Sequence, residues 1–416
     1  MPTYAAFLGN HPDLSLTELR ATVPELKVKR MLGSQIALVD TPAELSQRDL
    51  DRWGGIFLLA KSMEGKCTYD DLPALLQKET EGTKGKVTFS LRGFNIPRPT
   101  VHNLYRTIKH QFKDKGIPVR YIGNERKPPV SAQLHDAGLI SGKHGCELVL
   151  LGNDDSELIW VGRTVAVQNP DEYTKRDMEK PVRDTRAGLL PPKLAQILLS
   201  LGTWAVQGTP SNEKRTTRNQ KLTILDPFCG TGVIPMEALL KGWPVLASDL
   251  SLRAVNGCEK NLDWLRKEWK ILKRDVPSLV WKQDATKQFQ LKELPNVVVT
   301  ETMLGPPVSD RPLAKEVAKY RSACDALEIA FLQNASDTLP GVPLVVMFPV
   351  WYVKSGPVRL EQVWKKMKDI GYEAVLPPGS PIPDPARPSI VYRRADQFVG
   401  REIAILKPVK KDSAKK

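Results

Sequence analysis

A turn between a short apolar strand and a helix carries the residue types best suited to holding a small molecule. Residues 222–235 read LTILDPFCGTGVIP, so an apolar run ends on Asp226 and Phe228, Gly230 and Gly232 follow. A strand that ends on a carboxylate beside a glycine turn brings side-chain and backbone groups to one edge of a sheet. These residues predict a small-molecule site and leave open which molecule it binds.

A dinucleotide is the first ligand to test against this turn. In the dinucleotide-binding fingerprint a third small residue lets the helix pack closely on the strand, and Pro235 takes that place here. Asp226 would also repel a pyrophosphate, because both are negatively charged. The turn therefore argues against an oxidoreductase that uses a nicotinamide cofactor.

A carboxylate in this position suits a ligand with an ammonium group, and S-adenosylmethionine (SAM) has one on its methionine arm. We expect Asp226 to receive the ammonium, with the backbone of Gly230 and Gly232 against the methionine arm. Asp249 ends the next strand, PVLASD, where an acidic side chain takes ribose hydroxyls. Asp284 follows the third strand, in WKQDAT, and could accept from the adenine amino group. The alternative for each aspartate is a helix-cap or turn role.

The cysteines do not indicate metal or disulfide chemistry. The five are scattered and form no Cys-x-x-Cys pair, which argues against a zinc site and for a reducing compartment. Cys229 lies in the glycine turn with no histidine close in sequence, so we expect a structural role. With neither a signal peptide nor an apolar run long enough for a membrane helix, we expect a cytoplasmic monomer without a bound metal.

The charge of the chain favours a polyanionic partner such as nucleic acid. The formal net charge is +14 over 416 residues, although solubility alone is an alternative explanation. Basic residues punctuate one region, and those that could track phosphates include Arg92, Arg98, Arg126, Lys127 and Lys143. Arg183 and Arg186, ahead of the glycine turn, could also meet RNA phosphate.

Alternating strand and helix patterns divide the chain into modules. We predict a small βα-type module over 1–62, a second α+β module over 63–170, and a connecting helix and polar loop over 171–221. From 222 to 408 the β-then-α alternation predicts a doubly wound parallel sheet with an antiparallel edge hairpin. Residues 409–416 form a basic tail. The fold class is α/β.

The stretches DPFCGTGVIPMEA and YTKRDMEKPVRDTRAGLLPPKLAQILLSLG resemble the THUMP-domain tRNA guanine-N2 methyltransferases. The resemblance covers nearly the whole chain. It implies a ferredoxin-like module over 1–62, a THUMP RNA-binding domain over 63–170 and a Rossmann-like class I methyltransferase domain after them. It also implies SAM as cofactor and tRNA as substrate, with Asp226, Gly230 and Gly232 in the SAM loop and Asp249 and Asp284 at ribose and adenine.

The sequence departs from that family after the fourth strand of the sheet. Enzymes that methylate exocyclic amines carry Asp/Asn-Pro-Pro-aromatic there, whereas this chain has VVVTETMLGPPVSD. In one register Glu301 takes the Asp place; in the other Gly305, Pro306 and Pro307 form the motif without its polar group or its aromatic. We prefer the first, because Glu301 directly ends the strand. Aromatic residues after the next strand, Phe348, Trp351 and Tyr352, could instead stack on a base.

The sequence thus predicts a SAM-dependent RNA methyltransferase that acts on a base amine, with guanine N2 in tRNA as the first candidate. The altered loop leaves two alternatives open. One is a non-catalytic or repurposed RNA-binding protein that retains the SAM site. The other is a methyltransferase acting on an amine of another nucleic acid or of a protein.

Overall fold

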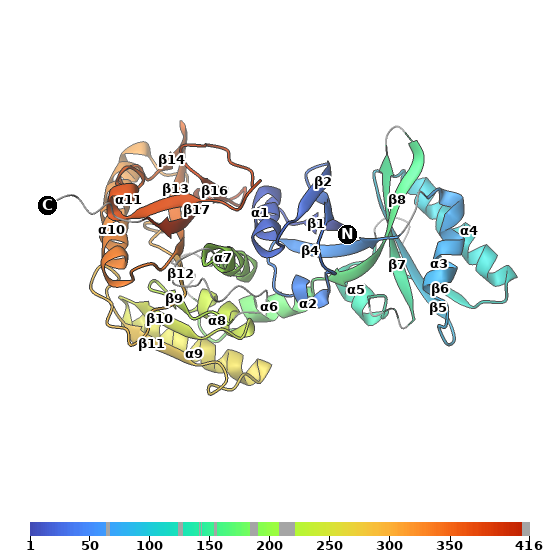
Figure 1. Ribbon diagram of the computed structural model, residues 1–416, viewed down its shortest axis with the longest axis horizontal. Helices are drawn as coiled ribbons and strands as arrows, with labels where there is room; N and C mark the ends of the chain where they lie inside the picture. The colour runs from blue at the N-terminus through green and yellow to red at the C-terminus, as the bar shows by residue number, and fades with distance from the viewer. Residues whose placement is uncertain are drawn as a thin grey trace. The chain divides into compact units, whose positions relative to one another are not determined.

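The computed structural model describes residues 1–63, 67–123, 128–140, 142, 144–153, 156–183, 190–207 and 221–409. The chain forms two compact units: Met1–Pro12 with Val23–Thr174, and Asp13–Thr22 with Lys175–Lys416. Each unit is built on one sheet (Figure 1). None of the helices in the described part of the chain combines the length and the apolar character needed to cross a membrane.

The sheet of the first unit runs through both modules expected before residue 170. Its order is β2-β3-β1-β4-β8-β7-β5-β6. Strands β4 and β8 pair antiparallel, with Leu58 opposite Val167, so the expected boundary at residue 62 falls within one continuous sheet. The strands are β1 Thr3–Leu8, β2 Lys27–Leu32, β3 Ile36–Asp40, β4 Ile56–Ser62, β5 Val87–Phe94, β6 Val119–Tyr121, β7 Gly145–Asn153 and β8 Ser156–Val167.

Helix α4, Arg98–Asp114, is the longest helix of the first unit and is strongly amphipathic. Ile108 and Phe112 are buried among the apolar side chains of β5, β7 and β8, and the basic side chains of the helix are exposed. The other helices up to residue 178 are α1 Pro12–Thr22, α2 Gln47–Leu50, η1 Tyr69–Asp71, α3 Leu72–Glu79, α5 Ser131–Asp136 and α6 Pro170–Met178.

The sheet of the second unit has the order β11-β10-β9-β12-β13-β17-β15. The first five strands are parallel, as predicted, and β17 runs antiparallel to both of its neighbours. The predicted hairpin is β16 paired with β17, but β17 lies inside the sheet because it pairs with β13 along one edge and with β15 along the other. The strands are β9 Ile224–Asp226, β10 Val245–Asp249, β11 Ser278–Lys282, β12 Val297–Glu301, β13 Leu344–Val353, β14 Gly356–Arg359, β15 Tyr372–Val375, β16 Ser389–Tyr392 and β17 Val399–Pro408.

Helices cover both faces of this sheet, so its central parallel strands are mostly apolar. In β12, Val297 and Val299 belong to the apolar core with α7, α8 and α9, and Val298 belongs to the core with α10 and α11. Successive side chains thus enter opposite cores, as the pleat of a strand requires. The helices are α7 Pro192–Ala205, α8 Val233–Leu240, α9 Leu252–Trp269, α10 Ala314–Thr338 and α11 Gln362–Ile370.

Candidate active site

Three acidic residues lie at the carboxyl ends of three neighbouring parallel strands. Asp226 ends β9, Asp249 ends β10 and Glu301 ends β12, with β9 between the other two. The strand order reverses beside β9, and in open α/β sheets ligands bind in the crevice outside such a switch point. The sheet therefore gathers residues that are far apart in sequence around one crevice.

Backbone conformation shapes the turn after β9. Gly230 has φ +51° and Gly232 has φ +87°, a region that side chains other than glycine rarely adopt. A Cβ on Gly232 would lie 2.6 Å from Cys258 Sγ of α9. At Gly230 only the backbone conformation favours glycine, because a Cβ there would have no atom within 4 Å. At Gly232 the packing of α9 also leaves no room for a Cβ.

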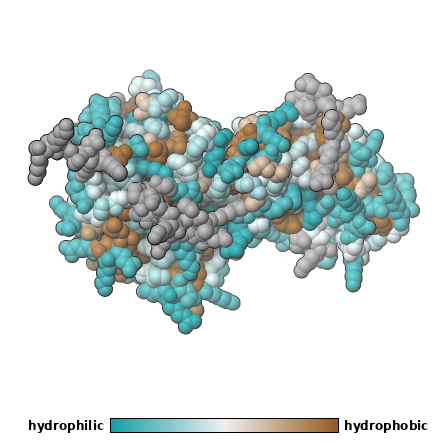
Figure 2. Space-filling view, in the orientation of Figure 1, coloured by the Kyte–Doolittle hydropathy of each residue, from teal (hydrophilic) through white to brown (hydrophobic). Residues whose placement is uncertain are grey.

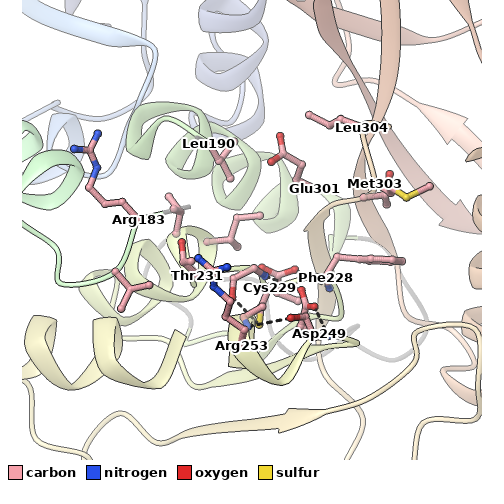
Figure 3. A pocket seen from close by; sticks show the side chains of 18 of the residues that line it. Arg183, Leu190, Phe228, Cys229, Thr231, Asp249, Arg253, Glu301, Met303 and Leu304 are labelled. Atoms are coloured by element: carbon pink, nitrogen blue, oxygen red, sulfur yellow. Dashed lines mark hydrogen bonds between the residues drawn. The ribbon is translucent and has the colours of Figure 1, made fainter. Parts of the chain in front are cut away.

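A pocket of about 370 Å³ opens above these strand ends, within the usual range for small-molecule sites. In Figure 3, Glu301, Met303 and Leu304 lie along one side of it, with Cys229, Asp249 and Arg253 along the other. The remaining lining residues come from the glycine turn and the start of α8, from the start of α9 and from the loop after β12. Val182, Arg183 and Leu190 complete the lining. The pocket lies entirely within the second unit.

Asp226 is fully buried at the floor of this pocket. Its Oδ1 accepts a hydrogen bond from Thr300 Oγ1 (2.7 Å) and one from the Phe228 amide (3.3 Å). No donor among the described residues reaches its Oδ2. Burial, together with the charges of Asp249 and Glu301, raises the pKa of Asp226 to about 8, although the hydrogen bonds from Thr300 and Phe228 oppose the rise. A cationic group in the pocket would reverse this effect by favouring the carboxylate.

Asp249 ties the glycine turn to β10. Its Oδ2 accepts from the Gly230 amide (3.0 Å) and its Oδ1 from the Ser251 amide (2.8 Å). Each carboxylate oxygen keeps a further lone pair, so the side chain can still accept from hydroxyl groups in the pocket. Asp249 is thus both a structural partner of the turn and a polar wall of the pocket.

Glu301 is held by an arginine from another part of the sheet. Arg401 Nε of β17 donates to Glu301 Oε1 at 2.5 Å, and both side chains are mostly buried. Burial raises the pKa of Glu301, and the charge and hydrogen bond of Arg401 oppose that rise. The loop after Glu301 is fastened to β13, because the Thr302 hydroxyl and amide both donate to the Met347 carbonyl.

The two registers of this loop differ in where they lie. Glu301 through Gly305 line the pocket, and Gly305 has φ +87° with its Cα facing the indole of Trp351. Pro306 and Pro307 are exposed and are not among the residues that line it. Of the two registers, the one that begins at Glu301 therefore has all five of its residues in the pocket lining.

Several other predicted residues lie away from the pocket. Asp284 accepts from the amide and the hydroxyl of Thr286 (2.9 and 2.7 Å), an arrangement typical of a turn, and is not among the pocket residues. Phe348 and Trp351 are completely buried in the core with α10 and α11. Tyr352 is half-buried, with the guanidinium of Arg393 over its ring at 3.8 Å.

The cysteine of the turn is also placed for structure. Cys229 is buried, and its contact with Cys258 together with burial raises the pKa of its thiol. A thiol that resists ionisation is a poor nucleophile, which agrees with the structural role expected from the sequence.

The predicted phosphate-contacting residues fall into three groups. Arg98 and Arg183 are exposed, and Arg183 also lines the pocket. Arg92 is instead paired with the buried Glu147 (3.1 Å) and donates to the Pro129 carbonyl (2.7 Å). Arg126, Lys127, Lys143 and Arg186 lie outside the described residues.

Sequence reasoning missed residues that hold the site from behind. The buried amide of Asn261 on α9 bonds both the amide and the carbonyl of Val182 and the carbonyl of Thr231, which joins two walls of the pocket. Thr300 and Arg401 fix the two carboxylates of the floor. Only Thr300 carried a signal, as a polar residue in an otherwise apolar strand next to Glu301.

A comparison with curated proteins finds similarity to a methyltransferase over a short part of the chain. No protein-family profile matches the chain. A tRNA (guanine(10)-N2)-dimethyltransferase of Methanothermobacter thermautotrophicus is 37% identical over 75 residues, which is 18% of this chain and 18% of that protein. The chain thus matches less than a fifth of the length of this curated relative.

Solved structures of methyltransferases are similar to this chain at low sequence identity. TrmN from Thermus thermophilus is 16% identical with a TM-score of 0.47, covering 98% of this chain and 100% of that one. The SAM-bound magnesium protoporphyrin IX methyltransferase of Synechocystis is 14% identical with a TM-score of 0.34, covering 58% of this chain and 92% of that one. The strand order itself, five parallel strands followed by an antiparallel strand inserted before the last, is that of the class I methyltransferase fold.

Proposed function

We propose that this protein is a SAM-dependent methyltransferase that acts on a base amine in structured RNA, with guanine N2 of tRNA as the first candidate. The observation that carries the proposal is that Asp226, Asp249 and Glu301 line one pocket at the switch point of the sheet. The short stretch shared with a tRNA guanine-N2 dimethyltransferase supports the substrate class.

The residues of the pocket fit SAM. The free Oδ2 of Asp226 suits the ammonium of the methionine arm, and that charge would offset the cost of ionising a buried carboxylate. Gly230, with open space where a Cβ would stand, lets the ligand approach the backbone. Asp249 retains lone pairs for the ribose hydroxyls. Asp284 as the adenine contact stays a prediction, and because its Oδ1 is bonded to Thr286 we expect that contact to contribute little to SAM affinity.

The chemistry asks for positioning more than for acid–base catalysis. SAM, when bound, supplies a methyl group on a sulfonium that is already a good leaving group. Glu301 would accept an N–H of the target amine and direct the nitrogen lone pair into the pocket. Leu304 and Met303, beside it, offer apolar surface against a base in place of the aromatic ring that the family motif carries.

The first unit offers a surface for the RNA backbone. Helix α4 and strand β6 expose Arg98, Arg106, Lys109, Lys113 and Arg120, and the region of α4 is mainly hydrophilic in Figure 2. Such a row of cations suits a phosphate backbone. We propose that residues 63–170 are the RNA-binding THUMP domain and that 1–62 are the ferredoxin-like module before it.

Two measurements on the purified full chain test the proposal. Calorimetry with SAM should show one site, and the absence of binding would overturn the methyltransferase assignment. Bulk tRNA incubated with methyl-labelled SAM should gain label, and nucleoside mass spectrometry should find it on N2-methylguanosine. Label on another nucleoside would keep the enzyme class and replace the target.

The loop without Asp-Pro-Pro-aromatic favours one second candidate, an RNA-binding protein that has kept the SAM site. It predicts SAM binding and tRNA binding with no label transferred to any nucleoside. The same two measurements therefore separate the candidates.

A further inference from the structure

The Glu301–Arg401 pair joins two strands that do not touch. Strand β13 lies between β12 and β17, with Glu301 opposite Met347 and Arg401 opposite Pro349. Arg401 therefore reaches across the end of β13 to place its Nε 2.5 Å from Glu301 Oε1. The exposed fractions are 4% for the Arg401 side chain and 17% for that of Glu301, so water screens this pair little.

The pair leaves the second oxygen of the Glu301 carboxylate without a donor among the described residues. Arg401 occupies Oε1, no donor among the described residues reaches Oε2, and Glu301 is part of the pocket lining. A carboxylate fixed at one oxygen cannot rotate freely, so the direction of the other oxygen is set. That oxygen can accept a hydrogen bond from one N–H group.

The charge of Glu301 depends on Arg401 because the other surroundings oppose ionisation. Burial disfavours the carboxylate of Glu301, and the charge and hydrogen bond of Arg401 favour it. The charged groups that face this region are Asp226 on β9, Asp249 on β10, Arg253 on α9, Arg183 ahead of α7, Glu328 on α10 behind Thr302, and Arg401 on β17.

We propose that Arg401 is a positioning residue that keeps Glu301 aimed so that its free oxygen accepts an N–H of the methyl acceptor. This rests on the proposed function and narrows it to acceptors that carry an N–H on the reacting nitrogen. It also explains how a side chain one methylene longer than aspartate is held in this place. The aspartate of the family motif has a shorter side chain that reaches less far. The glutamate side chain here is longer, and its bond to Arg401 supplies the constraint that it needs.

The positioning role is tested by measuring methyl transfer across pH for wild type, Arg401→Met and Arg401→Lys. Arg401→Met should lose kcat by about 10- to 100-fold near neutral pH and recover part of it as the pH rises, because Glu301 then ionises without help. Arg401→Lys keeps the charge and should follow the wild-type pH profile more closely. SAM affinity should stay within about threefold in both. Wild-type kcat and pH profile in Arg401→Met would overturn the proposal.

A second measurement does not need activity. An unpartnered Glu301 has a pKa raised above its unfolded value, so its contribution to stability is complete at low pH and is lost as the pH rises through the folded pKa. Arg401→Met should therefore lose Tm more steeply than wild type as the pH rises above the ordinary pKa of a glutamate, and Glu301→Gln with Arg401→Met should remove that extra slope. Equal slopes in the single and double variants would contradict the inference.

Arg359→Met is the matched control. Arg359 pairs with the buried Glu402 of the same sheet (3.3 Å), which also bonds Ser389, so the variant removes an arginine from a carboxylate elsewhere in the sheet. It should leave the pH profile of transfer unchanged. If no substrate is methylated by wild type, the proposed function fails, and the stability slopes still decide whether Arg401 governs Glu301.

Discussion

The two sides of the pocket are built in different ways. The side with Asp226, Gly230, Gly232 and Asp249 is held mainly by a turn, its backbone amides and the ends of adjacent strands, although Asp226 also accepts from Thr300 of β12. The side with Glu301 depends on Arg401, one hundred positions later, which reaches across an intervening strand. The half of the site expected to bind SAM thus comes mostly from residues 226–249, whereas the half expected to meet the acceptor is brought together from distant strands by the fold.

Substitution of Glu301 by Gln should separate the two sides most clearly. Gln keeps the shape and loses the charge, so kcat for methyl transfer should fall on the order of 100-fold. SAM affinity should change by less than about threefold, because the side chain is not expected to contact the cofactor. Single-turnover transfer and calorimetry measure the two quantities, and a loss of SAM affinity as large as the loss of kcat would make the sides one unit.

Substitution of Asp226 by Ala should give the converse result. Removing the carboxylate that receives the ammonium should weaken SAM binding about 10- to 100-fold, the cost of a hydrogen bond to a charged group. Calorimetry measures it directly. Asp249→Ala is expected to follow with a smaller loss, and unchanged affinity in Asp226→Ala would remove this residue from the cofactor site.

Gly232→Ala tests whether the close packing of α9 on the turn excludes a side chain at residue 232. The new Cβ would stand 2.6 Å from Cys258 Sγ at a φ of +87°, so the free energy of unfolding should fall by about 2–4 kcal/mol. Gly242→Ala is the control, since Gly242 has φ +76° and nothing within 4 Å of its Cβ. Chemical denaturation of both variants should show the larger loss in Gly232→Ala, and equal losses would leave strain without a clash.

The pH dependence of stability should report on Asp226. Its folded pKa of about 8 lies above its unfolded value of about 3.9. The stability contributed by the protonated form is complete below the unfolded pKa and is lost as the pH rises to about 8. Asp226→Asn, which cannot ionise, should therefore have a higher Tm than wild type near pH 8, and the difference should shrink steadily as the pH falls toward about 4. Thermal scans without ligand test this, and parallel curves for the two proteins would contradict the assigned pKa.

Asp284→Ala should have the smallest effect of the series. Its Oδ1 is committed to Thr286, and it is not among the pocket residues, so we expect a change in SAM affinity below about threefold. A loss matching that of Asp249→Ala would show that Asp284 reaches the adenine after all.

Local signals predicted the parallel strands and the turn well. Apolar runs that end on Asp226 and Asp249, and the glycines between them, fix strand ends and backbone direction within a few residues. The pairing of Arg92 with Glu147 and of Glu301 with Arg401 could not be read in the same way, because each joins strands distant in sequence. The interior place of β17 had no local signal either, since a hairpin pattern does not say which strand it will join.

The position of β17 has a consequence for how the chain is made. It is synthesised after every other strand of the second sheet, yet it fills the gap between β13 and β15. Until it emerges from the ribosome, β13 exposes an apolar edge to which other chains could pair, and Glu301 lacks its arginine. The sheet is therefore completed, and the acceptor side of the pocket assembled, only after translation has passed residue 408, which makes nascent chains of this protein candidates for chaperone protection.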